Sequence, residues 1–394
     1  MNFRITAKNT LIPLFYLLSI LCGFSFANFA KIYGYPLFQL LFLIIPFVGV
    51  FFIRNIILER GEIWYFWYLI ASLLAFFISS INSLFPWITF SYALLPLMAF
   101  IVFTQVLDIR VYNYGMRLIL ASVTIITVLG WSIFFNLIDR DFVTNFTNEG
   151  EFGIGYWGIR YETSTRNADY LYPLLGLCLS SYQYLKKPSF PYIILIIFFS
   201  FTLLASQSRG AILITALLLG FVLFQKNSKS LFAMLALIGF IVIWYVEINY
   251  ELISLYTDII ISFFDANTSR NYSNSERIYI YTESIKNGFE YPFGVGLDNF
   301  GSSMSNSLTP GTNSGENAYL TIFVERGFLG LISFLLFMII TTVDTFRASF
   351  NLNTLLLPSM WLYLFFNYEL NTIFANFILF IIMLTNKVSR ETDV

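Results

Sequence analysis

The sequence predicts an all-α integral membrane protein with about twelve transmembrane helices and two larger polar segments on one side of the membrane. Hydrophobic residues make up 58% of the 394-residue chain and charged residues only 11%, whereas soluble domains carry about 25% charged residues. Long apolar runs recur along the whole chain. Because a segment in lipid must satisfy its own backbone hydrogen bonds, these runs are predicted to be helices of a single polytopic domain, 1–394.

Twelve apolar runs are the expected spans. They are 11–30, 35–53, 62–81, 86–107, 116–138, 167–185, 190–206, 210–225, 230–249, 317–346, 352–368 and 371–386. The spans 190–206 and 210–225 are short for a hydrocarbon core of about 30 Å. They either cross a locally thinned bilayer or form a helical hairpin that does not fully cross it. The first span lacks a clear small-residue cleavage site, which favours a retained helix over a signal peptide.

The distribution of basic residues predicts the orientation. Thirteen of the 22 Lys and Arg residues, Lys387 among them, fall in segments on the same side as the N-terminus, and the other nine, Arg326 among them, fall on the outer side. Basic loops stay in the cytoplasm, so both termini are expected there. The long polar segments 139–166 and 250–316 then lie on the outer side, and their Gly, Asn and Ser residues predict loops.

The second outer segment also contains a predicted helix, 275–287. Ser275 is a candidate cap and Gly288 a candidate stop. The side chains expected on one helical face are Ile278, Tyr281 and Ile285.

Composition excludes several kinds of chemistry. The chain has no histidine, which excludes His-based metal sites and Ser-His or Cys-His nucleophile systems. Its two cysteines, Cys22 and Cys178, both lie inside apolar runs and imply no disulfide framework. We expect no cofactor, no bound metal and no nucleic-acid partner.

Arg209 stands between two apolar spans, in Ala-Ser-Gln-Ser-Arg-Gly-Ala at 205–211. A charge so close to the membrane is costly and marks a functional site by default. An arginine beside the free N–H groups of a helix start is well suited to bind phosphate. The alternative is an arginine that snorkels to the outer interface.

Arg160 and Arg166 lie close together in 156–170, among tyrosines and a tryptophan. Arginines among aromatic side chains suit phosphate and sugar binding. An interfacial aromatic belt with solvated charges explains the same pattern.

Glu316 and Asn317 stand where the second outer segment enters the span 317–346. A partly desolvated carboxylate at this place is a candidate general base. A carboxylate favoured by the dipole at a helix start is an equal alternative.

These elements together resemble the O-antigen polymerase and ligase superfamily, membrane glycosyltransferases that act on undecaprenyl-pyrophosphate-linked sugars. The resemblance covers about 150–345. In chain order its elements are Arg160 with Arg166-Asn167, the turn 208–211, Arg277, 292–296 leading to Phe300, 316–320 and 325–330.

The resemblance implies roles for particular residues. Arg209 and Arg277 are expected to bind the pyrophosphate, with Arg160 and Arg166 as helpers. Glu316 is the expected base on the acceptor hydroxyl. The further candidates for substrate contacts are Asn317, Tyr281 and Tyr319.

The ligase branch is expected to carry a histidine before Asn-x-Tyr-Leu, where this chain has Glu316. That departure favours the polymerase branch (Wzy). The implied setting is a bacterial inner membrane with the active site facing the periplasm. The implied partners are an undecaprenyl-pyrophosphate-linked donor and acceptor, the lipid bilayer, a chain-length regulator and a flippase.

Two other functions remain open. A ligase that transfers glycan to lipid A–core or to protein differs from a polymerase only in its acceptor. A flippase or transporter of lipid-linked oligosaccharides is the non-enzyme alternative. Transporters place charges at mid-membrane on several helices, whereas the charges singled out above cluster in the outer segments and at their borders.

Overall fold

The computed structural model describes residues 31–32, 35–36, 60–82, 109–135, 137, 153–155, 158–160, 171–205, 209–226, 271–297, 317–366 and 373–392. Apart from residues 35–36, the expected spans 11–30, 35–53, 86–107 and 230–249 lie outside these residues. The total of about twelve spans therefore stays a prediction.

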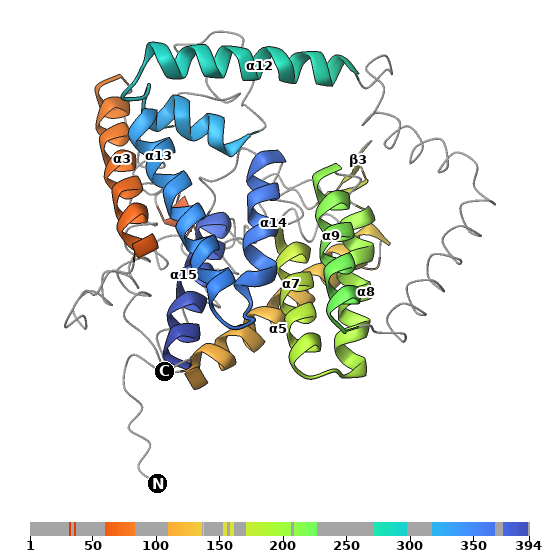
Figure 1. The fold of residues 1–394 in the computed structure, drawn as a ribbon. Coiled ribbons are helices and arrows are strands. Elements are labelled where there is room, and N and C mark those ends of the chain that lie inside the picture. The colour runs from red at the N-terminus through yellow and green to blue at the C-terminus, as the bar shows by residue number, and fades with distance from the viewer. Residues whose placement is uncertain are drawn as a thin grey trace.

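Helices make up most of the described structure (Figure 1). They are α3 (Arg60–Asn82), α5 (Ile109–Phe134), α7 (Leu171–Lys186), α8 (Phe190–Ala205), α9 (Arg209–Lys226), α12 (Asn271–Glu290), α13 (Ala318–Arg347), α14 (Asn353–Phe366) and α15 (Ile373–Thr392). Each of the other eight expected spans overlaps one of these helices, whereas Tyr35 and Pro36, at the start of the expected span 35–53, lie in a strand. By length and hydropathy, α3 and α13 are candidate membrane spans within the described part, and α8, α9 and α14 contribute shorter apolar helices.

Four short strands accompany the helices within the described residues. Strand β1 (Lys31–Ile32) pairs antiparallel with β2 (Tyr35–Pro36), and β3 (Gly153–Gly155) pairs antiparallel with β4 (Gly158–Arg160). The expectation of an all-α fold is thus right for the bundle and incomplete for these loops.

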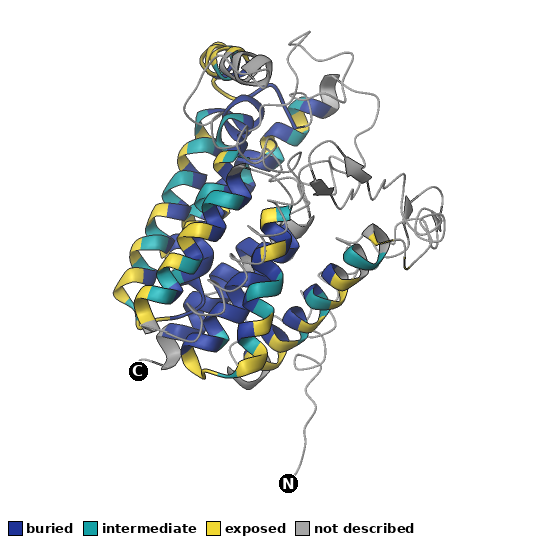
Figure 2. Ribbon diagram, turned by 90° about the vertical axis from the view of Figure 1, so that its right-hand side faces the viewer, coloured by how far each residue is buried: buried dark blue, intermediate teal, exposed yellow. Residues whose placement is uncertain are grey.

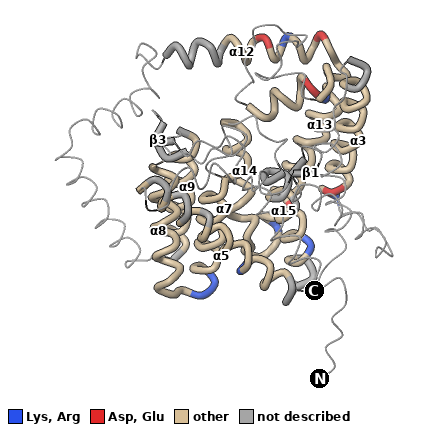
Figure 3. The backbone as a smooth tube through the Cα atoms, turned by 180° about the vertical axis from the view of Figure 1, so that it is seen from behind, with Lys and Arg blue, Asp and Glu red and all other residues tan. Residues whose placement is uncertain are grey.

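The helices run between two ends of a bundle. Helix α12 crosses the upper end in Figure 1, and the C-terminus lies at the lower end. Charged residues of the described segments gather near these two ends, as Figure 3 shows. This separation agrees with a membrane orientation in which an apolar middle is flanked by two polar borders.

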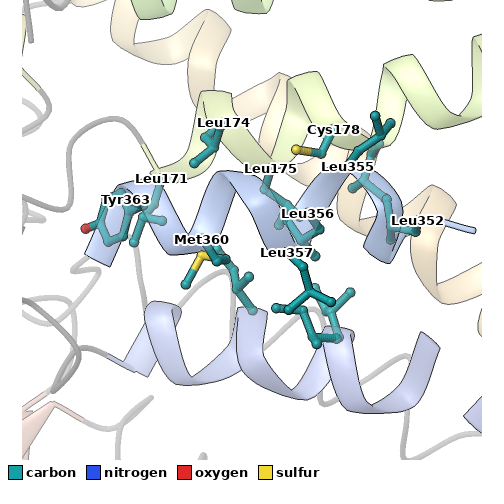
Figure 4. Close-up of a cluster of buried hydrophobic side chains, with 14 of the residues drawn as sticks. Leu171, Leu174, Leu175, Cys178, Leu352, Leu355, Leu356, Leu357, Met360 and Tyr363 are labelled. Atoms are coloured by element: carbon teal, nitrogen blue, oxygen red, sulfur yellow. The ribbon is translucent and has the colours of Figure 1, made fainter. Parts of the chain in front are cut away.

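Helix α7 lies at the centre of the bundle and contacts α5, α8, α9, α14 and α15. Its side chains are buried from Leu171 to Leu185 with few exceptions, as expected of a helix enclosed on all sides. Figure 4 shows Leu171, Leu174 and Leu175 against the buried leucines of α14. Exposed residues lie on the outer sides of the helices, as Figure 2 shows.

Helices α3 and α13 form the most extensively packed pair of described helices. Tyr65 packs on Phe337 with ring centroids 4.9 Å apart, and Tyr68 packs on Phe334 at 5.1 Å. Near the lower end, Gly61 faces the side chain of Thr341. Aromatic pairs of this kind add to the stability that burial alone provides.

A polar cluster closes the lower end of the bundle. Its contacts are Lys387 Nζ to Glu62 Oε1 at 3.2 Å, Asn353 Nδ2 to Asn386 Oδ1 at 2.8 Å, Thr345 Oγ1 to Asn386 Oδ1 at 3.0 Å, and Tyr112 Oη with Thr385 Oγ1 at 2.9 Å. They join α3, α5, α13, α14 and α15. Lys387, counted from the sequence among the cytoplasmic charges, lies within α15, and its side chain is buried against Glu62.

The predicted helix 275–287 is present but longer at both ends, as α12. Gly288 does not end the helix, which continues to Glu290. The glycine instead allows the ring of Phe323 to pack closely against α12. Pro292 follows instead and disfavours helical backbone in the residue before it. The buried face carries Ile280, Ser284 and Asn287, while Tyr281 is only half-buried and Ile285 is exposed.

Candidate functional site

A break in α13 shapes the upper end of the bundle. Gly327 has φ 65° and ψ −165° and divides the helix into an upper part, 318–326, and a long lower part. The upper part runs at an angle to the lower one in Figure 1. Backbone of this kind is essentially restricted to glycine.

The loop 291–297, which follows α12, fills the break. Its main-chain hydrogen bonds are Val295 N to Val324 O at 2.9 Å, Gly296 N to Glu325 O at 3.1 Å and Phe328 N to Pro292 O at 3.0 Å. A kinked helix loses internal partners for its carbonyl and amide groups. The loop supplies these partners, so hydrogen bonds from the loop stabilise the break in α13.

Two glycines allow this close approach. Gly294 has φ 88°, and a Cβ placed there would collide with the main chain of Glu325. A Cβ on Gly327 would collide with the carbonyl oxygen of Pro292. The sequence elements 292–296 and 325–330 are therefore the two sides of one junction.

The same loop is fixed to α3. Leu297 N donates to Ala75 O at 3.3 Å, and Ser79 Oγ donates to Leu297 O at 2.7 Å. Helix α3, the loop and the break in α13 consequently hold one another in place near the end of a candidate span.

An ion pair lies beneath this junction. Arg326 Nη1 donates to Glu325 Oε2 at 2.9 Å, and its Nε donates to Ser72 Oγ at 3.0 Å. The guanidinium carbon lies 5.5 Å from the ring centroid of Tyr68. The side chains of Arg326 and Glu325 are only 3% and 2% exposed, so protein encloses the pair on nearly all sides.

Sequence reasoning missed this ion pair because it counted Arg326 among the charges of the outer side. A usable signal was present. Two adjacent opposite charges inside a long apolar run, followed directly by glycine, indicate a self-paired charge at a helix break.

Asn317 and Tyr319 have well-defined structural contacts. Asn317 is the N-cap of α13, and its Oδ1 accepts from Tyr319 N at 3.0 Å and Leu320 N at 3.2 Å. Tyr319 stacks on Trp361 and donates its hydroxyl to the Trp361 carbonyl at 3.3 Å. Their proposed substrate contacts stay predictions, and these contacts show how the start of α13 is fixed.

The main chains of three candidate arginines are described. Arg277 lies in α12, Arg209 is the first residue of α9, and Arg160 is the last residue of β4, which contacts α8. The elements α12, β3 and the start of α9 are all drawn in the upper part of Figure 1. Arg166 and Glu316 lie outside the described residues, although Glu316 directly precedes the Asn317 cap.

Metal binding has no visible support in the described part of the chain. Among these residues no group of three or more Cys, Asp or Glu side chains is placed to hold an ion. The site predicted from the sequence consists of arginines and one carboxylate, Glu316, and arginines suit an anionic leaving group.

Comparisons with known proteins bear on the predicted family resemblance. Residues 194–335 match a family described as O-antigen ligase. An O-antigen polymerase of Salmonella muenchen is 32% identical over 128 residues. Both comparisons support the O-antigen polymerase and ligase superfamily. The predicted resemblance is thereby confirmed, although the match to the polymerase spans only 32% of this chain and 32% of the relative.

The matched region, residues 194–335, includes most of the elements at the upper end of the bundle. It runs through α8, α9, α12 and the break in α13, and it ends at Leu335. Glu325, Arg326, Gly327 and the loop 291–297 all lie inside it. Glu62 and Lys387 of the lower cluster lie outside it.

Proposed function

We propose that this protein polymerises undecaprenyl-pyrophosphate-linked oligosaccharide repeat units into O-antigen or a related surface polysaccharide. The growing glycan is transferred to the non-reducing end of a new lipid-linked repeat, and undecaprenyl pyrophosphate is released. Support comes from the similarity to an O-antigen polymerase and from Glu316, which replaces the histidine expected in a ligase.

The reaction needs a base and a site for a departing anion. A hydroxyl of the acceptor sugar attacks the anomeric carbon of the donor glycan and forms the new C–O bond. The bond from that carbon to the pyrophosphate oxygen breaks, and the oxygen leaves with the electron pair. Glu316 takes the hydroxyl proton. Attack opposite the leaving group inverts the anomeric centre.

Arginines are suited to the leaving group because charge develops on its oxygens as the bond breaks. In the proposal Arg209 and Arg277 bind the pyrophosphate, and Arg160 and Arg166 assist them. Asn317, Tyr281 and Tyr319 contact the sugars. The pyrophosphate leaving group is already activated, so the reaction requires no cofactor.

One observation carries the proposal. The capped start of α13, next to Glu316 in sequence, is fixed at the same end of the bundle as α12 and the start of α9, which carry Arg277 and Arg209. With the termini in the cytoplasm of a bacterial inner-membrane protein, this end faces the periplasm. A chain-length regulator and a flippase are the proposed partners.

A ligase is the second candidate, because the family that matches residues 194–335 is described as O-antigen ligase. Both reactions use the same donor and leaving group, so the arginines serve either one. The acceptor distinguishes them: a lipid-linked repeat unit for a polymerase, and lipid A–core for a ligase.

Deletion of the gene in its host, followed by gel analysis of surface polysaccharide, separates the two candidates. A polymerase mutant loses the ladder and keeps a core-plus-one-repeat band. A ligase mutant shows bare core while polymer accumulates on the carrier lipid. An unchanged ladder contradicts both assignments for this glycan.

A further inference from the structure

The exposed side of α12 has two chemically different flanks. Its buried face packs against α13. On one exposed flank lie Ile285, which is 47% exposed, and Phe289, which is 66% exposed. On the other lie Lys286, with 68% of its side chain exposed, and Glu290. Because residues four apart share one side of a helix, each pair forms its own stripe.

The loop that follows α12 also exposes a large apolar side chain. Phe293, in the loop 291–297, is 81% exposed. Three large apolar side chains are thus exposed on this flank of α12 and in its following loop. Adjacent exposed apolar side chains of this size indicate an interaction surface rather than ordinary surface variation.

This flank is continuous with the outward face of α13. The ring of Phe289 contacts Phe323 and Phe328 edge-on, at centroid distances of 5.7 Å and 5.5 Å. Below Phe328, an exposed apolar strip descends the helix. Its residues are Leu329, Ile332, Ile339, Val343 and Phe346. Since α13 is a candidate membrane span, lipid is the solvent of this strip.

The exposed apolar flank of α12 lies level with the end of a candidate membrane span. The candidate span Arg60–Ser79 has 20 residues, which at 1.5 Å per residue crosses a hydrocarbon core of about 30 Å. The loop 291–297 hydrogen-bonds to Ala75 and Ser79, in the last turns of that span. Helix α12 also runs across the ends of the other helices, in the direction of a membrane surface (Figure 1).

We propose that α12 is an interfacial helix that binds the lipid surface at the upper end of the bundle. Ile285, Phe289 and Phe293 insert between the acyl chains, and Lys286 and Glu290 face the headgroups and water. An amphipathic helix of this kind lies in the plane of the boundary, with its apolar side a few ångströms below the headgroups. The apolar flank of α12 adjoins the exposed apolar strip of α13. Because lipid is the expected solvent of that strip, the same lipid is the favoured partner of the flank.

The test measures which reagent reaches each flank. The full chain, with Cys22→Ser and Cys178→Ala, receives a spin label at Phe289→Cys or Ile285→Cys on the apolar flank. Glu290→Cys on the polar flank is the matched control. Each variant is reconstituted in phosphatidylcholine–phosphatidylglycerol vesicles. Collision rates are measured with oxygen, which partitions into lipid, and with nickel-EDDA, which stays in water.

The ratio of oxygen to nickel-EDDA collisions is expected to be at least several-fold higher at both apolar-flank positions than at Glu290→Cys. Equal nickel-EDDA access on the two flanks overturns the proposal, because the apolar flank then faces water. Exclusion of both reagents also overturns it, because a protein then covers the flank. Two positions on one flank keep the test decisive if one variant fails to incorporate. The result does not depend on polymerase activity.

Discussion

Two buried ion pairs lie at opposite ends of the packed helices α3 and α13. At the upper end, Glu325 and Arg326 are neighbours in the sequence, and Arg326 also bonds to Ser72 of α3. At the lower end, Glu62 of α3 pairs with Lys387 of α15. Both pairs are about equally buried. Their surroundings differ, because the upper pair adjoins a helix break and an inserted loop, whereas the lower pair joins regular helices.

The difference indicates two tasks. A buried pair is in itself a weak source of stability, so the surroundings of each pair indicate its role. The upper pair supports irregular backbone inside the region that matches the superfamily, at the end assigned to catalysis. The lower pair lies outside that region and closes the bundle. We therefore propose that the upper pair supports the shape of the site and that the lower pair holds the helices of the bundle together.

The largest effect is expected for Arg326→Met. It leaves the buried carboxylate of Glu325 without its partner, and breaking such a pair costs about 3–5 kcal/mol. Thermal unfolding of the purified protein in detergent measures the loss. Adding Glu325→Gln is expected to recover only part of it, because the bond to Ser72 and the contact with Tyr68 remain absent.

Lys387→Met is expected to destabilise by an amount near the lower end of the same range of about 3–5 kcal/mol. Here the double variant Glu62→Gln/Lys387→Met should regain most of the lost stability, since two regular helices can repack around neutral side chains. If the upper and lower double variants regain equal shares of the lost stability, the two pairs do not differ in the way proposed.

Gly327→Ala comes next. The conformation at this position costs a non-glycine residue about 1–3 kcal/mol, and the new Cβ meets the Pro292 carbonyl. Gly220→Ala is the matched control: Gly220 lies in α9 with nothing within 4 Å of a built Cβ, and alanine favours a helix by about 1 kcal/mol. The control should melt at the same temperature or higher. An unchanged melting temperature in Gly327→Ala argues against the described break.

Asn317→Ala should have the smallest effect on stability. Loss of an N-cap costs about 1 kcal/mol, and Asn317→Ser should restore most of it because serine also caps. A loss of polymer in both variants at normal melting temperature would point to a substrate contact by the Asn317 amide. Parallel measurements of unfolding and of polymer length separate the two roles.

The helices were predictable because each long apolar run must form one. The ends of α12 were not predictable from the sequence. Gly288 reads as a helix stop, but it lies inside the helix and packs against the ring of Phe323 in α13. Burial of Arg326 depends on Ser72, which is 254 positions away in the chain, and burial of Lys387 depends on Glu62. The motifs 292–296 and 325–330 were recognisable in order, but their pairing through main-chain hydrogen bonds appears only in three dimensions.

The most direct test is complementation of the deletion host with the Glu316→Gln variant. Gly220→Ala, at matched membrane abundance, is the control. If catalysis takes place at the upper end with Glu316 as the base, the control restores the polysaccharide ladder. Glu316→Gln then yields only core with one repeat unit, although the protein is present and folded. A full ladder from Glu316→Gln would contradict the account and leave Glu316 as a carboxylate that merely favours the start of α13.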